Sequence, residues 1–152
     1  MIAVLQRVTS AFCVVEGELI GQCGEGLMIL LGVKAGDDEA DARLLAEKIA
    51  KLRIFEDENG KMNRSVNDIS GSALVVSQFT LLANYSHGNR PDYLASEKPG
   101  RAKELYEYFS ALLAKLLLSG KVQTGRFGAD MKLEIHNDGP VTIVMDSAVL
   151  KK

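Results

Sequence analysis

The sequence has 152 residues, of which 47% are hydrophobic and 25% are charged, a composition typical of an ordinary globular protein. Its formal charge of −2 argues against binding to nucleic acid through bulk positive charge, while leaving room for a local basic patch. The length suits one domain over residues 1–152, and the start of the chain lacks the pattern of a signal peptide. No apolar run approaches the ~20 residues that a membrane-spanning helix needs, so we expect no membrane contact. Because the two cysteines lack metal or redox spacing, we expect a cytoplasmic protein with reduced thiols.

Strand patterns come first along the chain. Apolar residues alternate over residues 2–8, and the next strand pair is expected to turn at Glu16-Gly17. Residues 27–33, LMILLGV, are apolar on both faces. They predict a central strand that is covered on both sides.

The apolar period then changes to that of a helix. From Asp37 the sequence places Leu45 and Ile49 on one helical face, with acidic residues in the first turn and lysines in the last. Pro99 is expected to open a second helix, which ends before Gly120.

The remaining segments predict further strands. A short strand and a turn at Asn59-Gly60 follow the first helix, and residues 73–83, ALVVSQFTLLA, read as a strand. If that strand runs through, Ser77 and Phe79 share one face, and Gln78 and Thr80 share the other.

The chain is then expected to close with three separate strands. These are KVQTG at residues 121–125, KLEIHN at 132–137 and VTIVMDS at 141–147, the last opened by a Gly-Pro pair. Because strands outnumber helices and do not alternate with them, the pattern predicts a single α+β domain with an antiparallel or mixed sheet.

Familiar catalytic patterns are missing. The sequence has no phosphate-binding loop, no HExxH pair and no GxSxG elbow. His87 and His136 fall in polar surroundings and are expected at the surface, and Cys13 and Cys23 lack metal-ligand spacing. We therefore expect no metal site and no cofactor.

The polar residues that remain are unusually placed. Arg7 shares a strand face with Ala3 and Leu5, where a buried charge needs hydrogen-bond acceptors. Polar residues also cluster at the end of the apolar strand that leads to Ser77. Each could simply be satisfied within the core, but their coincidence in one small domain favours a site.

Two segments carry a family resemblance. SQFTLLA at residues 77–83 and NDGPVTIVMDS at residues 137–147 resemble the two signature motifs of the D-aminoacyl-tRNA deacylases, also called D-tyrosyl-tRNA deacylases. The similarity runs along the whole chain in order, through QRV, VEGE, LLGV, KMN and TGRFGADM.

The resemblance implies a fold, a reaction and an assembly. It implies a compact α+β domain with a strongly curved sheet, a homodimer, and hydrolysis of the ester that joins a D-amino acid to the 3′ end of tRNA. It also implies that the strand end at Ser77 to Thr80 lines the ester. Gly139-Pro140 would then be a cis peptide that reaches into the partner's pocket, with Arg7 holding it in place.

From the resemblance and the residue chemistry we assign roles. The catalytic candidates are Gln78, Phe79 and Thr80; the chiral-selectivity candidates are Arg7, Gly139 and Pro140; the substrate-binding candidates are Ser77, Phe127, Met131 and Asn137. Thr80 is expected to position the substrate because no base stands beside it in sequence, with a covalent role as the alternative. Phe79, Phe127 and Met131 would pack the adenine, and core packing is the alternative for the last two.

The proposed selectivity works by rejection. If parallel carbonyls at Gly139-Pro140 hold the amino group, they also form a wall that an L side chain strikes. Glycine has no side chain, so tRNA carrying a D-amino acid or glycine is the expected partner. The basic patch for RNA would use Arg90, Lys98, Arg101 and Arg126.

Two other classes remain open from the sequence. A non-catalytic RNA-binding module would bind charged and uncharged tRNA equally. A thiol-dependent enzyme would need Cys13 or Cys23.

Overall fold

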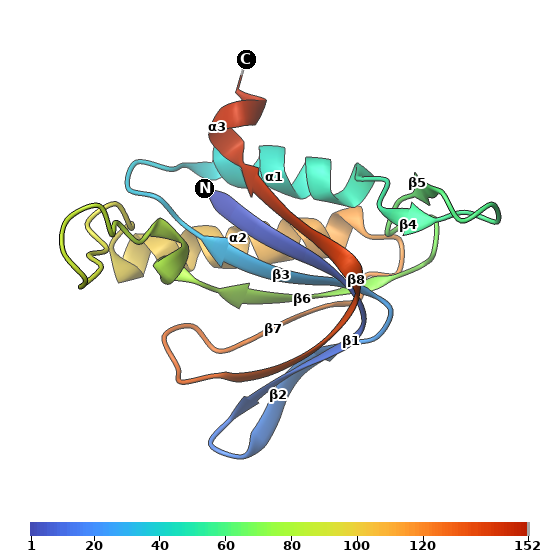
Figure 1. Ribbon diagram of the computed structural model, residues 1–152, viewed down its shortest axis with the longest axis horizontal. Helices are drawn as coiled ribbons and strands as arrows, with labels where there is room; N and C mark the ends of the chain where they lie inside the picture. The colour runs from blue at the N-terminus through green and yellow to red at the C-terminus, as the bar shows by residue number, and fades with distance from the viewer. Residues whose placement is uncertain (152) are drawn as a thin grey trace.

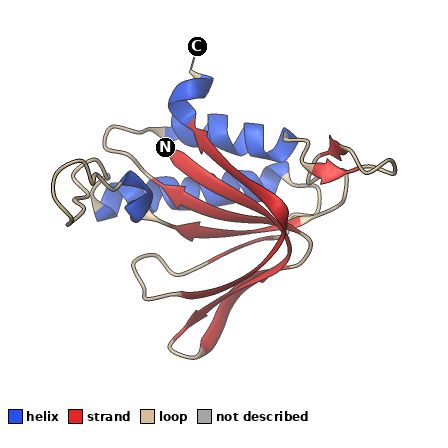
Figure 2. Cartoon of the chain, in the orientation of Figure 1, coloured by secondary structure: helices blue, strands red, loops and turns tan. Residues whose placement is uncertain are grey.

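The computed structural model describes residues 1–151, in which a curved mixed sheet of six strands carries two long helices on one side (Figures 1 and 2). The strands of this sheet are β1 (Ile2–Val15), β2 (Glu18–Cys23), β3 (Gly26–Gly32), β6 (Ser72–Ser77), β7 (Val122–Thr124) and β8 (Lys132–Asp146). The other elements are α1 (Glu39–Lys51), the hairpin β4 (Phe55–Glu56) and β5 (Met62–Arg64), the 3-10 helix η1 (Phe79–Leu82), α2 (Pro99–Leu116) and α3 (Ser147–Leu150).

The order of the strands explains the curvature. It is β2-β1-β3-β6-β7, with β8 on the other edge of β1. Along one edge, β1 pairs first with β3 and then with β2, so this long strand belongs to both halves of the curved sheet. A Cβ atom on Gly21 of β2 would lie 2.4 Å from the carbonyl oxygen of Thr124 in β7, so glycine permits these strands to approach closely. The expected α+β fold with a strongly curved mixed sheet is confirmed.

The main core lies between this sheet and the helices. Leu45 and Ile49 of α1 are fully buried, as are Leu105 and Phe109 of α2. Burying each such side chain stabilises the fold by about 1.5–3 kcal/mol. Asp38 caps α1 through a reciprocal hydrogen-bonding box, which explains why the helix begins where the acidic residues cluster.

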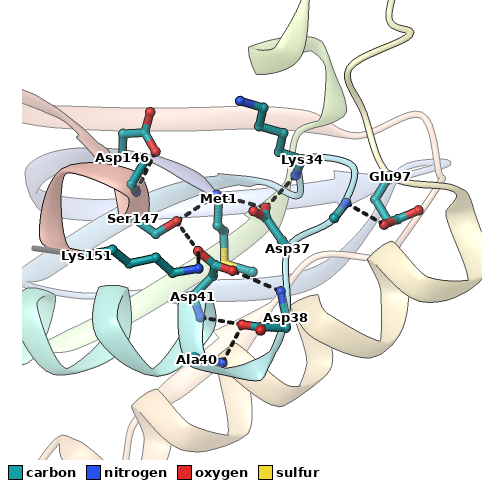
Figure 3. A network of polar contacts seen from close by, with 12 residues as sticks. Met1, Lys34, Asp37, Asp38, Ala40, Asp41, Glu97, Asp146, Ser147 and Lys151 are labelled. Atoms are coloured by element: carbon teal, nitrogen blue, oxygen red, sulfur yellow. Dashed lines mark hydrogen bonds and ion pairs between the residues drawn. The ribbon is translucent and has the colours of Figure 1, made fainter.

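A polar network joins both ends of the described chain to α1 (Figure 3). The amino group of Met1 lies 2.9 Å from Ser147 Oγ and 2.8 Å from Asp37 Oδ2. Ser147 donates to Asp41 at 2.6 Å, and Lys151 lies 2.9 Å from the same carboxylate. Burial acts to raise the pKa of Asp41, but the hydrogen bonds from Ser147 and Lys151 hold it below its usual value. The network therefore fixes the start of β1 next to the first turn of α1.

Two expectations about strands were wrong in their detail. The strand predicted over residues 73–83 ends at Ser77, and η1 follows it, so Gln78 and Thr80 do not share a strand face. The two strands expected at 132–137 and 141–147 form one strand, β8, because both parts pair with β1. Gly139-Pro140 therefore lies inside a long strand, not at its mouth.

Within residues 1–151, no helix combines the length and apolar character needed to cross a membrane.

Candidate functional site

A mainly apolar groove of about 540 Å³ lies beside the end of β6. Its walls come from the ends of β3 and β6, the turn into η1, the long loop before α2, and α2 itself. Among the residues that line it are Leu31, Phe79, Tyr93, Leu94, Tyr106 and Phe127. The volume falls within the ~300–1,000 Å³ usual for small-molecule sites.

The turn that follows β6 forms one wall of the groove. Gln78 N donates to the carbonyl of Leu31 at 2.8 Å, which ties the turn to the neighbouring strand. The Gln78 side-chain amide donates to Thr80 Oγ1, so the hydroxyl is held by an amide and not by a base. The backbone N–H groups of Phe79 and Thr80 open η1, where helical geometry supplies no partner. Within residues 1–151, neither N–H donates to another protein group.

The loop before α2 holds Phe79 from two directions. The Tyr93 ring packs edge-on against the Phe79 ring, with centroids 5.0 Å apart and planes at 71°. Ser96 Oγ donates to the carbonyl of Phe79 at 3.2 Å. Phe79 nevertheless stays 58% exposed, so its ring is available to a ligand. The sequence analysis missed Tyr93 and Ser96 because they lie in a polar loop, where only the aromatic side chain gave a signal.

A second cluster surrounds Arg7, which is only 6% exposed. Its Nη1 donates to the carbonyl of Ile54 and its Nε to the carbonyl of Asp138, each at 2.9 Å. Carboxylate oxygens of Asp138 and Glu56 lie 3.3 Å and 3.8 Å from the guanidinium. The expectation that Arg7 needs acceptors is confirmed, and two of them are backbone carbonyls.

Arg7 lies opposite a protruding segment of β8. Val8 pairs with Asn137 and Gln6 pairs with Thr142, so one residue of β1 faces residues 138–141 of β8. We call residues 138–140 the bulge. Gly139 and Pro140 are exposed, and the peptide bond between them is cis.

Asn137 closes the base of the bulge. Its side-chain amide donates to the carbonyls of Arg7 at 3.3 Å and Val141 at 3.2 Å. A Cβ atom on Gly139 would lie 2.0 Å from Asn137 Oδ1, so residue 139 has room only for glycine while Asn137 holds this position. The structure thus places Asn137 as a brace, and its substrate contact remains a prediction.

The groove and the bulge lie at opposite ends of the sheet. Ser77 is level with Leu31 and Ala3 across the paired strands, whereas Arg7 is four residues further along β1. Four residues span about 13 Å at ~3.3 Å per residue. Figure 1 shows η1 beyond the tip of β6 on the left and the bend of β8 on the right. One chain therefore does not bring its own bulge to its own groove.

The structure distinguishes Phe127 from Met131, the two residues that were expected to pack either against the adenine or in the core. Phe127 lines the groove and packs against the ring of Tyr106, with centroids 5.9 Å apart. Met131 instead packs with the second core cluster, which includes Val8 and Cys13, and does not line the groove. For Met131 the packing agrees with the core alternative, and its role as a substrate-binding residue stays a prediction.

The two cysteines and the two histidines do not line the groove. Burial raises the pKa of Cys23 to about 11 and also raises that of Cys13. His87 and His136 are exposed, and His136 lies 3.0 Å from Glu134. Among residues 1–151, no three potential metal ligands gather in one place.

Known proteins are similar to this chain over nearly its full length. Residues 4–146 match the family model described as D-Tyr-tRNA(Tyr) deacylase. A D-aminoacyl-tRNA deacylase of Ruegeria pomeroyi is 57% identical over 146 residues, which cover 96% of this chain and 99% of the relative. One of Persephonella marina is 53% identical over 150 residues, which cover 99% and 100%.

Two solved structures are similar in fold. The structure of a c-Myc DNA Unwinding Element Binding Protein has a TM-score of 0.90 at 41% identity and covers 96% of this chain and 98% of its own. A probable eukaryotic D-amino acid tRNA deacylase has a TM-score of 0.79 over 95% of this chain and 98% of its own. At 16% identity, the second likeness concerns the fold alone.

Proposed function

This chain belongs to the D-Tyr-tRNA(Tyr) deacylase family, and from that premise we propose that it is a D-aminoacyl-tRNA deacylase, which hydrolyses the ester between a D-amino acid and the 3′ end of tRNA. The observation that carries the proposal is the apolar groove beside the end of β6. Phe79, whose backbone N–H lacks a protein partner within residues 1–151, lines it, with Thr80 as the next residue, and no nucleophile–base pair among the described residues lies at it.

The groove suits a reaction that needs little help from side chains. An aminoacyl ester is already activated, so the enzyme must mainly orient it and stabilise the oxyanion. The N–H groups of Phe79 and Thr80 would serve as the donors, each contributing roughly 3 kcal/mol to the transition state. The vicinal 2′-OH of the terminal ribose would assist the attack. Thr80, held by Gln78, would position the ester and not attack it.

Chiral selection would come from a second copy of the chain. The bulge of one protomer would enter the groove of its partner, because the two features lie too far apart within one chain. Exposure of Gly139 and Pro140 leaves them free to enter, and Arg7 and Asn137 hold the bulge from behind. An L side chain would strike the bulge, whereas a D side chain would point away from it.

The four cations proposed as the basic patch differ in their surroundings, and Arg90 is exposed in the long loop before α2. Arg101 lies 3.1 Å from carboxylates of both Glu39 and Glu104, so its charge is already compensated. Lys98 lines the groove, and Arg126 borders an adjoining hollow. These two cations are the better placed to meet phosphate groups of the acceptor end.

The decisive experiment follows ester loss from D-alanyl-, L-alanyl- and glycyl-tRNA under identical conditions. We expect D-alanyl- and glycyl-tRNA to be cleaved and L-alanyl-tRNA to be spared, although glycine and alanine differ by one methyl group. If glycyl-tRNA is as stable as L-alanyl-tRNA, the site recognises the D side chain by direct contact. The proposal that selectivity comes from excluding L side chains is then wrong. If no substrate loses its ester, the chain is a binding module and not a deacylase.

A second experiment tests the catalytic groups. The Thr80→Ala variant should keep activity within about tenfold of the wild type, because the hydroxyl has no base to activate it. A substrate that ends in 2′-deoxyadenosine should lose most of its reactivity. A trapped acyl-Thr80 intermediate would overturn this assignment.

A further inference from the structure

A second hollow adjoins the groove across Phe127. It has a volume of about 400 Å³ and shares two walls with the groove, the rings of Tyr106 and Phe127. Its lining includes two cations, Lys103 and Arg126, and one carboxylate, Glu107, whereas the groove has the single cation Lys98 beside Glu97. Both volumes lie in the ~300–1,000 Å³ range of small-molecule sites, so two ligand groups of nucleotide size fit side by side.

The residues that lie between the groove and the second hollow are held in place by hydrogen bonds to β6. Tyr106 is 3% exposed, and its hydroxyl donates to the carbonyl of Val75 at 2.7 Å. The same carbonyl accepts from Gly125 N at 3.1 Å, which pins the loop that carries Phe127 to β6. Burial raises the pKa of Tyr106 to about 12, so this hydrogen bond persists at neutral pH.

In the loop after β7, two adjacent residues differ in character: Arg126 carries a charge, and Phe127 carries an aromatic ring. Arg126 is exposed, and its guanidinium forms no ion pair within residues 1–151. Lys103 is only loosely paired, 4.0 Å from Glu107 one helical turn away. Of the two cations, Arg126 is therefore the one whose charge is not compensated by a nearby carboxylate among the described residues, and it is the better placed to bind an anion.

We propose that this second hollow is the subsite for the penultimate nucleotide of the tRNA 3′ end. Phe127 would separate it from the terminal adenosine in the groove, and Arg126, with Lys103, would meet the phosphodiester that joins the two nucleotides. The inference rests on the proposed function, since that function places the terminal adenosine in the groove. A splayed single strand held by aromatic rings and a basic edge is a usual way for proteins to bind RNA ends.

The test compares two minimal substrates that differ by one nucleotide, 3′-D-alanyl-adenosine and 3′-D-alanyl-cytidylyl-adenosine. We expect the added cytidylyl group to lower KM of the wild type by roughly five- to tenfold, the scale of one charged contact at an exposed site. Arg126→Ala should remove this gain, so that the two substrates have similar KM values, whereas Arg126→Lys should keep part of the gain. Lys115→Ala is the matched control, because it removes one exposed charge from the far end of α2.

The possible outcomes distinguish a failure of the subsite proposal from a failure of the deacylase proposal. An equal effect of Arg126→Ala on both substrates, or no gain from the cytidylyl group, overturns the subsite while the deacylase proposal stands. If neither ester is cleaved, the deacylase proposal fails. Calorimetric binding of unacylated adenosine and cytidylyl-adenosine then tests the subsite directly, and equal affinities for the two probes would overturn it.

Discussion

The two ends of the sheet are built in opposite ways. At the end of β6 the chain forms an apolar groove whose most exposed ring, Phe79, is held by Tyr93 and Ser96. At the other end a buried arginine and Asn137 brace a segment that projects into solvent. The groove is a concave, mainly apolar surface, whereas the bulge is an exposed projection that is braced from behind. Under the proposed function, the two features would complement each other, with the bulge of one copy of the chain entering the groove of a second copy.

The largest effect is expected from removing the brace at the bulge end. Arg7→Ala deletes the donor to the carbonyls of Ile54 and Asp138, which should destabilise the fold by roughly 2–4 kcal/mol. Because a shift of about 1 Å in a selective group can cost ~100-fold, D-alanyl-tRNA hydrolysis should fall by about that factor or L-alanyl-tRNA should become a substrate. Denaturant unfolding and the two hydrolysis rates measure these effects.

The control for this variant is Arg7→Lys, which keeps the charge but cannot reach both carbonyls as a fork. It should be less destabilised than Arg7→Ala while losing selectivity in the same direction. Wild-type rates and full rejection of L-alanyl-tRNA by Arg7→Ala would show that the bulge does not select the substrate.

Mixed dimers test whether the two ends work across chains. Arg7→Ala damages the bulge, and Ser77→Trp fills the groove, so each variant alone should lack the wild-type combination of D-alanyl-tRNA cleavage and L-alanyl-tRNA rejection. A purified mixed dimer would contain one intact groove facing one intact bulge, and should recover about half of the wild-type activity per dimer. Differently tagged chains allow its isolation. A mixed dimer that lacks this combination, as its two parents do, would place the site within one chain.

These comparisons also show what the sequence could and could not predict. The family followed from two motifs and is confirmed, and the turn at Glu16-Gly17 and the central strand β3 were predictable from local patterns. The end of β6 was not, because the alternation of Ser77 to Thr80 fits a strand as well as a turn. Only pairing with β1 on both sides of the bulge makes β8 continuous, and that pairing is long-range.

Within the candidate site, only the residues that belong to the matched sequence motifs could be predicted from the sequence. Arg7 was singled out because a charge on an apolar strand face needs acceptors, and both acceptors exist. The role of Met131 stays a prediction, because an apolar residue in a matched motif looks the same whether it packs in the core, as Met131 does here, or against a ligand. Tyr106 was missed because it lies on the apolar stripe of α2, where a tyrosine reads as core.

A moderate effect is expected at the groove end from the loop that holds Phe79. Ser96→Ala removes the hydrogen bond to the Phe79 carbonyl and should lower kcat by roughly two- to tenfold, the scale of one neutral hydrogen bond. KM should change little, because the groove itself stays open. Ser96→Thr keeps the hydroxyl and should restore most of kcat. A rise in KM at constant kcat would mean that Ser96 only shapes the groove.

The smallest effect is expected from the two thiols, which lie at neither end. Cys13 and Cys23 are buried, burial raises the pKa of both, and neither lines the groove. Because a raised pKa favours the protonated thiol, neither cysteine is expected to supply a thiolate nucleophile at neutral pH. The double variant Cys13→Ala/Cys23→Ala should lose about 1–2 kcal/mol of stability by leaving small cavities, yet retain activity within about twofold per folded molecule. Activity measured well below the unfolding temperature, with the folded fraction checked by circular dichroism, separates the two quantities. If the folded double variant cannot cleave D-alanyl-tRNA, the reaction runs through a thiol, and the division of labour between groove and bulge is wrong.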